Sequence, residues 1–275
     1  MFDATTQGSA RLLAQLGGKA FYSCRVADDE LGAFYSQDLQ ANGVATNLTH
    51  TAAQAGQTGS CMVLVTPDAE RSMCTFLGAT SQLDATALHP HDIAKSRIYY
   101  MEGYLAASTT GLEAAVQGRQ IATLHKVQTA LTLSDVSMIN FCRAGLQAMI
   151  GNGLDYLFAN EEEAQTWCGT SDLDAIMGQL SQLATTVCLT RGPKGCIVVQ
   201  GDRRIDVPAV PTKAVDTNGA GDMFAGCFLF AITHGHSAEV AAQLANRAAA
   251  AVVSQHGNRL TAAQLQGIAA QATQA

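Results

Sequence analysis

Apolar residues follow two spacings along the chain, and the two spacings alternate. A recurrence every three or four residues predicts a helix, and a short unbroken apolar run between Gly or polar residues predicts a strand. Strands that alternate with helices indicate an α/β fold of three α/β/α layers, with a mostly parallel central sheet covered on both faces. The expected helices span 8–16, 30–42, 110–120, 137–151, 161–168, 172–184, 222–234, 237–254 and 261–273. The expected strands span 20–26, 97–104, 131–135, 154–160, 186–190 and 195–200.

The segment 58–77 breaks this alternation. Its sequence, TGSCMVLVTPDAERSMCTFL, has two apolar runs around the turn residues Pro67, Asp68 and Ala69, which predicts a β-hairpin. No linker rich in Pro, Ser or charge and no internal repeat interrupts the chain. We therefore expect a single domain over residues 1–275 that carries a small hairpin at about 58–77.

The composition limits the possible partners. Hydrophobic residues make up 48% of the chain and charged residues 14%, which is enough apolar material for a large core. The formal net charge is −7 and no block of Lys and Arg occurs, so we expect neither nucleic acid nor an anionic membrane surface as a partner. The apolar helical stretches are interrupted by Asn, Arg or Gln, so no membrane span is expected.

The cysteines favour a reducing compartment. None of the eight lies in a CxxC pair, and most lie in apolar runs such as TTVCLT and GCIVV, which indicates buried thiols. The first residues, MFDATTQ, lack the basic flank and apolar stretch of a signal peptide. A cytoplasmic location is therefore expected.

Polar residues follow several of the expected strands. In open parallel sheets, ligands bind beyond the carboxyl ends of the strands. The sequence therefore predicts one crevice at that edge of the sheet. The polar residues at the strand ends are Glu102-Gly103, Ser134-Asp135, Asn160-Glu161 and Thr190-Arg191-Gly192.

The stretch DTNGAGDMFAGCFL, residues 216–229, leads small residues directly into an apolar helix pattern. The first helical turn has unpaired N–H groups and partial positive charge, and small residues let an anion approach them. Gly219-Ala220-Gly221 is therefore either an anion-binding turn or a tight turn that requires glycine. Asp222 is either an ordinary helix-start residue or a base that accepts the proton of a hydroxyl during phosphoryl transfer.

The same stretch closely resembles the C-terminal signature D-T-x-G-A-G-D-x-F of the ribokinase-like (PfkB) family of carbohydrate and nucleoside kinases. The resemblance implies that Asp222 is the catalytic base. It also implies that Gly219 and the amides of Ala220, Gly221 and Asp222 form an anion hole. Asp216 and Thr217 would lie on the phosphate side of the site.

Other segments extend the resemblance over nearly the whole chain. Asp29 and Gly32 match the family pattern V-G-x-D-x-x-G, with Ala27 in place of its usual glycine. NEEE at 160–163 fits N-x-x-E, which implies that Glu163 helps to hold Mg²⁺ through water, and TRGPKG at 190–195 fits the nucleotide loop T-x-G-x-x-G. The residues implied in ATP binding are Asn160, Thr190, Gly192, Gly195, Asp216, Thr217, Asn246, His256 and Gly257.

On the residues alone, each of these segments also has a simpler explanation. Three Glu residues at a helix start are favourable to the helix dipole. TRGPKG reads equally as a turn between two strands. Asn246 and the pair His256-Gly257 read as helix-surface and turn residues.

The segments TPDAERSMCTFLGATSQL, YYMEGYL and LTLSD are similar to bacterial adenosine-kinase-like members. This similarity implies an ATP- and Mg²⁺-dependent kinase of a sugar or nucleoside hydroxyl, with the hairpin as a partial lid. Asp29, Arg71 and Glu102 would face the acceptor. Arg71 is alternatively a surface charge of the hairpin, and Asp135 either touches phosphate or only caps the next helix.

The sequence departs from the family pattern near its start. The family's first strand and its Gly-Gly…Asn motif have no full counterpart, and the motif aligns with Asp3-Ala4 and Gly8. We therefore expect the N-terminal part of the acceptor site to be truncated or replaced. A homodimer through the hairpin at 58–77 would cover the exposed apolar surface. The alternative function is a catalytically weak nucleotide- or nucleoside-binding protein with a regulatory or structural role.

Overall fold

The computed structural model describes residues 5–49, 55–66 and 71–272, and the predicted turn at 67–69 lies outside them. The chain forms two compact units. The first unit comprises residues 1–82 and 209–275, and the second comprises residues 83–208. Each unit has its own secondary structure and is described by itself.

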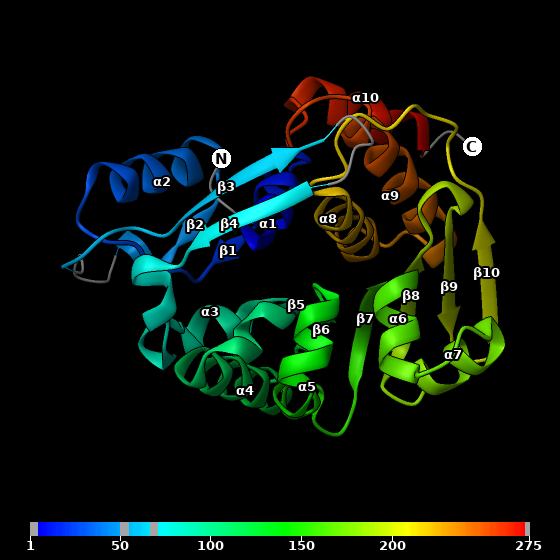
Figure 1. The fold of residues 1–275 in the computed structure, drawn as a ribbon, viewed down its shortest axis with the longest axis horizontal. Coiled ribbons are helices and arrows are strands. Elements are labelled where there is room, and N and C mark those ends of the chain that lie inside the picture. Colours follow the sequence, from blue (N-terminus) through cyan, green and yellow to red (C-terminus); the bar gives the residue numbers. More distant parts are fainter. Residues whose placement is uncertain (1–4, 50–54, 67–70, 273–275) are drawn as a thin grey trace. The chain divides into compact units, whose positions relative to one another are not determined.

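The second unit is built on a six-stranded sheet in the order β10-β9-β8-β7-β6-β5 (Figure 1). Strands β5 to β8 are parallel, whereas β9 and β10 are antiparallel to their neighbours. The predicted mostly parallel sheet is confirmed. The strands are β5 (Ile98–Glu102), β6 (Gln128–Thr132), β7 (Leu154–Asn160), β8 (Ala184–Thr190), β9 (Cys196–Gln200) and β10 (Arg203–Val207).

Helices of the second unit begin at side-chain caps and pack on this sheet. Ser108, Asp135, Asn160 and Asp172 each accept a backbone N–H in the first turn of the helix that follows. Helix α4 contacts β5 and β6, and α6 and α7 contact β8. The helices are α3 (Pro90–Lys95), α4 (Thr109–Leu124), α5 (Val136–Ile150), α6 (Glu161–Cys168) and α7 (Leu173–Leu180).

The first unit is mainly helical, and α8 is packed between α1 and α9. Helix α8 is almost wholly buried from Met223 to Leu229. Gly226 lets α1 come close, because a Cβ there would lie 2.7 Å from Leu12 Cδ2 and 3.1 Å from the Ser9 carbonyl oxygen. The helices are α1 (Thr5–Gln15), α2 (Glu30–Ala41), α8 (Ala220–Thr233), α9 (Ala238–Val253) and α10 (Ala262–Ala272).

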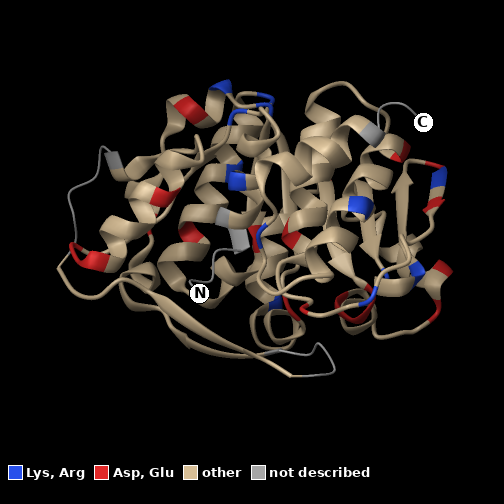
Figure 2. Cartoon of the chain, turned by 90° about the horizontal axis from the view of Figure 1, so that it is seen from above, with Lys and Arg blue, Asp and Glu red and all other residues tan. Residues whose placement is uncertain are grey.

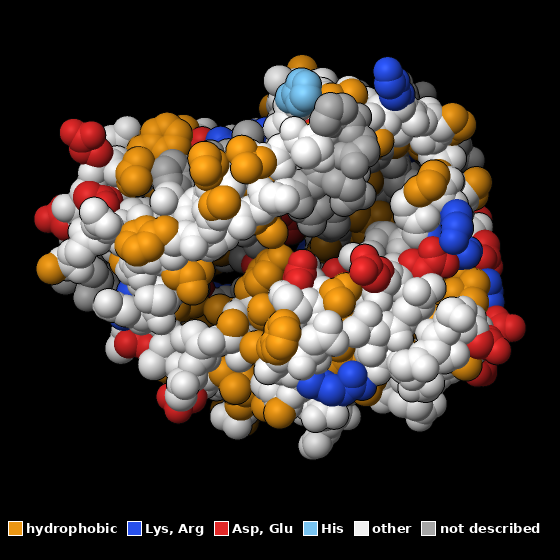
Figure 3. All heavy atoms as spheres, viewed as in Figure 1, with side chains coloured by type: hydrophobic (Ala, Val, Ile, Leu, Met, Phe, Trp, Pro, Cys, Tyr) orange, Lys and Arg blue, Asp and Glu red, His pale blue; other side chains and the backbone are white. Residues whose placement is uncertain are grey.

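The predicted hairpin is present in the first unit as β3 (Ser60–Val65) and β4 (Arg71–Phe76). The register pairs Met62 with Cys74 and Leu64 with Ser72, so Met62 and Leu64 lie on one face. Phe76 lies on the same face, opposite Ser60. Met62, Leu64 and Phe76 are 58%, 52% and 51% exposed, and Figure 3 shows hydrophobic side chains on this surface. The hairpin therefore presents an apolar face.

The expected strand at 20–26 is largely wrong. Only Phe21–Tyr22 forms a strand, β1, which pairs with β2 (Ala45–Thr46). Beyond it, the buried side chain of Asn47 replaces a strand partner. The Cys24 amide donates to Asn47 Oδ1 at 2.8 Å, and Asn47 Nδ2 donates to the Cys24 carbonyl at 2.9 Å. One side chain thus satisfies backbone groups that a ladder would otherwise pair.

The distribution of charged residues and the hydropathy of the helices agree with what the composition predicts. Figure 2 shows the basic residues interspersed with acidic ones over the chain. Among the described residues, no helix is both long enough and apolar enough to span a membrane.

Gly118 in α4 provides a stability test, because a Cβ there would lie 2.1 Å from the Tyr99 hydroxyl oxygen. We expect Gly118→Ala to lower the free energy of unfolding by about 1–3 kcal/mol through overpacking, despite the better helix propensity of Ala. Gly178→Ala in α7 is the control, since no atom lies within 4 Å of its Cβ position. This variant should be about 0.5–1 kcal/mol more stable than the parent. Urea denaturation measures both, and equal stabilisation of the two variants would contradict the packing described.

Candidate active site

Helix α8 begins at a turn that only glycine can make. Gly219 is the N-cap residue, with a left-handed φ of 77°. A Cβ on Gly219 would lie 2.6 Å from the Cβ of Asn258, which is closer than two carbon atoms can approach. The conformation and the contact together exclude a side chain. The turn therefore lies directly against the segment that follows α9.

The first amides of α8 have different surroundings. The Ala220 amide donates to the Thr217 carbonyl over 3.3 Å. The Gly221 amide has no protein acceptor among the described residues, and no atom lies within 4 Å of the position a Gly221 Cβ would take. The helix dipole adds partial positive charge at this point. An anion can therefore reach the Gly221 amide without displacing a side chain.

Asp222 lies in the first turn of α8 and is half-buried. Helix α1 contacts it twice: Ser9 Oγ donates to the Asp222 carbonyl at 3.1 Å, and a Cβ on Gly8 would lie 3.1 Å from Asp222 Oδ2. The backbone of α1 therefore lies against the carboxylate. Gly8 is where the family's Asn motif aligns, but its direct approach to Asp222 could not be read from the sequence.

Asp216 is buried, with an exposed fraction of 4%, and both its carboxylate oxygens accept backbone amides. Oδ1 accepts from Asn218 at 2.9 Å, and Oδ2 accepts from Gly257 at 2.9 Å. The structure thus brings Gly257, 41 residues away, to the turn before α8. Asn246 is buried in α9, and His256 is exposed beside Gly257.

In the second unit, Asn160 and Glu163 form a reciprocal cap at the start of α6. Asn160 Oδ1 accepts from the Glu163 amide at 2.8 Å. The two Glu163 oxygens accept from the Asn160 amide at 3.0 Å and from Asn160 Nδ2 at 2.7 Å. Glu163 is 5% exposed. Its carboxylate oxygens are thus already hydrogen-bonded, which is compatible with a role toward a metal ion through water.

The nucleotide loop expected at 190–195 adjoins this cap. Thr190 is the strand partner of Asn160, and Gly192 and Gly195 have left-handed φ values of 52° and 89°. Glu161 binds both basic residues of the loop, with Arg191 Nε at 3.2 Å and Lys194 Nζ at 3.0 Å. Lys194, followed by Arg191, lowers the pKa of the Glu161 carboxyl.

The three residues expected to face the acceptor differ in setting. Asp29 caps α2: its carboxylate accepts from the Gly32 amide at 2.8 Å, the Thr58 amide at 2.8 Å and Thr58 Oγ1 at 2.5 Å. Glu102 is 6% exposed at the carboxyl end of β5. The Arg71 backbone begins β4, and its side chain lies outside the described atoms. Asp29 thus ties the start of the hairpin segment to α2.

Some of the expected site residues thus lie together within each unit. In the first, the 216–222 turn is joined to Gly257. In the second, Asn160 and Glu163 lie beside the 190–195 loop. Local sequence patterns do not predict the contacts of Gly8, Asn258 and Lys194, because their partners are distant along the chain.

The geometry and the signature stretch agree with a comparison to known families. Residues 5–264 match the pfkB family carbohydrate kinase model. The chain belongs to this family.

Solved structures extend the similarity over nearly the whole chain. The adenosine kinase from Sinorhizobium meliloti is 35% identical, with a TM-score of 0.90 over 98% of this chain and 82% of that one. A ribokinase-like protein from E. coli, solved with ATP and Mg²⁺, is 20% identical, with a TM-score of 0.84 over 96% of this chain and 87% of that one. The second shows the fold alone.

A curated relative is similar to this chain over most of its length. Adenosine kinase 1 of Arabidopsis thaliana is 27% identical over 267 residues, which cover 90% of this chain and 76% of that protein. The protein is therefore a carbohydrate or nucleoside kinase with the three-layer α/β/α fold class of its relatives. The sequence-based resemblance and fold class are confirmed, whereas the roles of individual residues stay predictions.

The contacts of Asp29 predict an acid-sensitive contribution to stability. Hydrogen bonds from Thr58, first its hydroxyl and then its amide, hold the pKa of Asp29 below its usual value. This stabilisation is therefore present above the unfolded-state pKa of about 3.9 and is lost as the pH falls through the folded-state pKa. At pH 7, Asp29→Ala should lower the free energy of unfolding by about 0.5–2 kcal/mol through loss of the cap.

Denaturation from pH 7 down to pH 3 measures this effect. The difference between wild type and Asp29→Ala should shrink at the acid end. Asp28→Ala removes the neighbouring exposed carboxylate and should change stability by less than about 0.5 kcal/mol. A difference for Asp29→Ala that is the same at every pH would show that the charged carboxylate does not hold Thr58.

Proposed function

We propose that this kinase transfers a phosphoryl group from ATP, with Mg²⁺, to a hydroxyl of a ribose-containing nucleoside or a simple sugar. The observation that carries the proposal is the turn before α8. Gly219, at a φ of 77°, places the open Gly221 amide directly before Asp222 at a helix N-terminus. A donor for a phosphoryl oxygen and an acceptor for a proton thus occur on adjacent residues.

Asp222 is assigned as the general base. Its carboxylate orients the acceptor hydroxyl and takes its proton as the new O–P bond forms and the bond to the departing nucleotide breaks. A negatively charged side chain is favoured in the first turn of a helix by the helix dipole. Gly219, Ala220 and Gly221 form the anion hole, in which the Gly221 amide donates to the transferring group.

The nucleotide is assigned to the residues that match the family's nucleotide motifs. They are Asn160, Thr190, Gly192, Gly195, Asp216, Thr217, Asn246, His256 and Gly257. Since both oxygens of Asp216 already accept backbone amides, its part is to shape the turn that meets the phosphates. The ATP complex of the E. coli relative supports this choice of donor.

The protein offers few direct ligands for Mg²⁺. Among the described residues, no three His, Cys, Asp or Glu side chains lie together as a metal cluster. Mg²⁺ in kinases usually keeps several waters and is bound by substrate phosphates and one or two carboxylates. Glu163 suits this pattern, because its hydrogen-bonded carboxylate can orient a metal-bound water. When bound, the ion would neutralise charge on the phosphates.

Adenosine is the first acceptor to test, because the S. meliloti and A. thaliana relatives are adenosine kinases. Ribose is the second acceptor to test, because the family is described as one of carbohydrate kinases. Asp29, Arg71 and Glu102 are assigned to the acceptor side. Glu102 is the strongest of them, since it is a buried acid at the carboxyl end of a parallel strand.

One observation favours a second function, a catalytically weak nucleotide- or nucleoside-binding protein. The residue of α1 that lies beside the Asp222 carboxylate is Gly8, which has no side chain. Helix α1 therefore offers no side chain from this position to hold an acceptor hydroxyl beside the base. Binding of ATP without turnover of any acceptor would select this second function.

A cytoplasmic location is part of the proposal. All eight cysteines are free in the structure, and five of them are buried. Free thiols are typical of proteins in a reducing compartment.

The partner proposed for the hairpin is a second copy of the chain. Met62, Leu64 and Phe76 give it an exposed apolar face, and a lone two-stranded hairpin is marginally stable in water. Pairing of two such faces would remove both from solvent.

Asp222→Asn tests the base. With adenosine, ribose and fructose as acceptors, we expect kcat to fall at least about 10²-fold on the preferred substrate. The KM for ATP should change little, because the amides of the turn remain. Asp202→Asn, in the exposed turn between β9 and β10, is the control and should retain full turnover. Unchanged turnover by Asp222→Asn would remove Asp222 from the base role.

Leu64→Glu tests the dimer. Light scattering at micromolar concentration should give a dimer for the wild type and a monomer for this variant, because a buried unpaired charge opposes association. Leu124→Glu is the control, since Leu124 is 78% exposed at the end of α4, away from the hairpin sequence. A wild-type monomer, or the loss of the dimer in both variants, would contradict pairing through the hairpin.

A further inference from the structure

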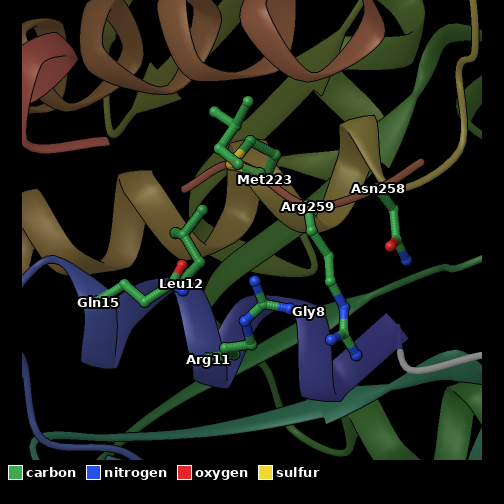
Figure 4. A pocket seen from close by; sticks show the side chains of 8 residues that line it. Gly8, Arg11, Leu12, Gln15, Met223, Asn258 and Arg259 are labelled. Atoms are coloured by element: carbon green, nitrogen blue, oxygen red, sulfur yellow. The ribbon is translucent and has the colours of Figure 1, made fainter. Parts of the chain in front are cut away.

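The first unit contains a pocket that none of the assigned roles uses. It lies between α1, the first turns of α8 and the segment 258–260, and it opens to solvent (Figure 4). Leu12, Met223 and Leu260 form its apolar part. Its polar part is formed by Arg11, Gln15, Asn258 and Arg259, and Gly8 completes the lining.

Arg11 brings a half-buried cation with unused donors to this pocket. Its Nε donates to Asn42 Oδ1 at 3.0 Å, and Gln15 Nε2 donates to the same oxygen at 2.9 Å. The two terminal nitrogens of Arg11 have no acceptor among the described residues. Burial, and then the charge of Arg259, lower the pKa of Arg11. Among the described residues, the guanidinium therefore has no direct ion pair that would offset its burial.

Arg259 brings a second guanidinium to the same pocket (Figure 4). It is bound by Asp38, with NH1 at 3.1 Å from Oδ1 and NH2 at 3.0 Å from Oδ2. Asp38 also attracts Arg11, so the single negative charge of this carboxylate is shared by two positively charged guanidiniums. The Arg11, Arg259 and Asp38 group therefore keeps a net positive charge, which favours an anion at the pocket.

Asn258 adds an acceptor to these donors. Its Oδ1 is buried and has no hydrogen-bond partner among the described residues. The Asn258 Cβ lies beside Gly219, so Asn258 stands next to the turn that begins α8. A buried acceptor without a partner costs about 1–3 kcal/mol. A ligand that offered a hydroxyl hydrogen would remove this cost.

We propose that this pocket is a binding site for a phosphate group, held by the guanidiniums of Arg11 and Arg259 and by Asn258 Oδ1. Guanidinium forks bind phosphate oxygens with charge-assisted hydrogen bonds. Inorganic phosphate keeps at least one P–OH hydrogen near neutral pH, which Asn258 Oδ1 accepts. Sulfate carries no such hydrogen, so the same pocket binds sulfate less well. The site is distinct from the α8 amides, because none of the lining donors belongs to that turn.

Titration calorimetry without nucleotide tests the site independently of turnover. Inorganic phosphate and sulfate are titrated at constant ionic strength, and methyl phosphate is titrated in parallel. We expect phosphate to bind more tightly than sulfate. Binding of methyl phosphate as well would assign the pocket to phosphate esters, and its exclusion would assign it to the free ion.

Variants localise the binding. Arg11→Gln should weaken phosphate binding at least about tenfold, since hydrogen bonds to charged groups contribute about that much. Arg11→Lys should retain only part of the affinity for phosphate, because Lys lacks the forked donor geometry of the guanidinium. Asn258→Ala keeps the Cβ against Gly219 and should remove the preference for phosphate over sulfate. Arg203→Gln is the control: it removes one positive charge at an exposed position of β10 and should bind phosphate with wild-type affinity.

Two outcomes would overturn the site. One is the absence of phosphate binding to the wild type. The other is equal affinity in the wild type, Arg11→Gln and Arg259→Gln, which would locate the phosphate elsewhere, such as the α8 amides. Circular dichroism melts establish that each variant is folded, and Arg259→Gln replaces Arg11→Gln if the latter unfolds. Neither result depends on whether Asp222 acts as the base.

Discussion

The contact between Gly219 and Asn258 is the constraint on which the candidate site of the first unit depends. The left-handed φ of Gly219 turns the chain into α8 with its amides open, and the Asn258 Cβ occupies the space that a side chain would need. Asp216 fixes this arrangement by binding the amides of Asn218 and Gly257. A buried carboxylate that accepts two amides costs little to bury, whereas loss of either amide would leave a charge uncompensated. The turn is therefore positioned by residues that are not expected to touch substrate.

The second unit positions its site by strand register instead. Parallel pairing of β7 with β8 puts Asn160 opposite Thr190, so the cap of α6 and the nucleotide loop begin at the same level of the sheet. The ion pairs of Glu161 with Arg191 and Lys194 then join the helix start to the loop. Because Arg191 is largely buried and Lys194 is exposed, the Arg191 pair is the less screened by solvent. Glu161 is thus an acid of NEEE that contacts the loop.

Local patterns were enough to predict most of the fold and the positions of the site segments. Helices such as Glu161–Cys168 have both an N-cap residue and apolar residues at helical spacing. The hairpin segment has turn-forming residues between its two apolar runs. Strand β10 was missed because only Ile205 and Val207 of its five residues face the interior. The strand expected after Lys19 was overestimated because Asn47, far along the chain, satisfies its backbone. The two amide partners of Asp216 and the approach of Gly8 to Asp222 were likewise beyond local reasoning, since they depend on contacts 41 and 214 residues apart.

Asn258 belongs to both the turn and the phosphate pocket, whereas Arg11 belongs only to the pocket. The Asn258 Cβ limits the position of Gly219, and its amide group lines the pocket. A ligand that binds this amide would therefore lie one residue away from the turn on which α8 begins. Coupling between two binding sites is reciprocal. If phosphate in the pocket alters nucleotide affinity by some factor, nucleotide must alter phosphate affinity by the same factor, and the shortest covalent path for that effect is the segment 257–259. Substitution of Arg11 would weaken ligand binding without changing this segment, which separates the energetics of the pocket from those of the turn.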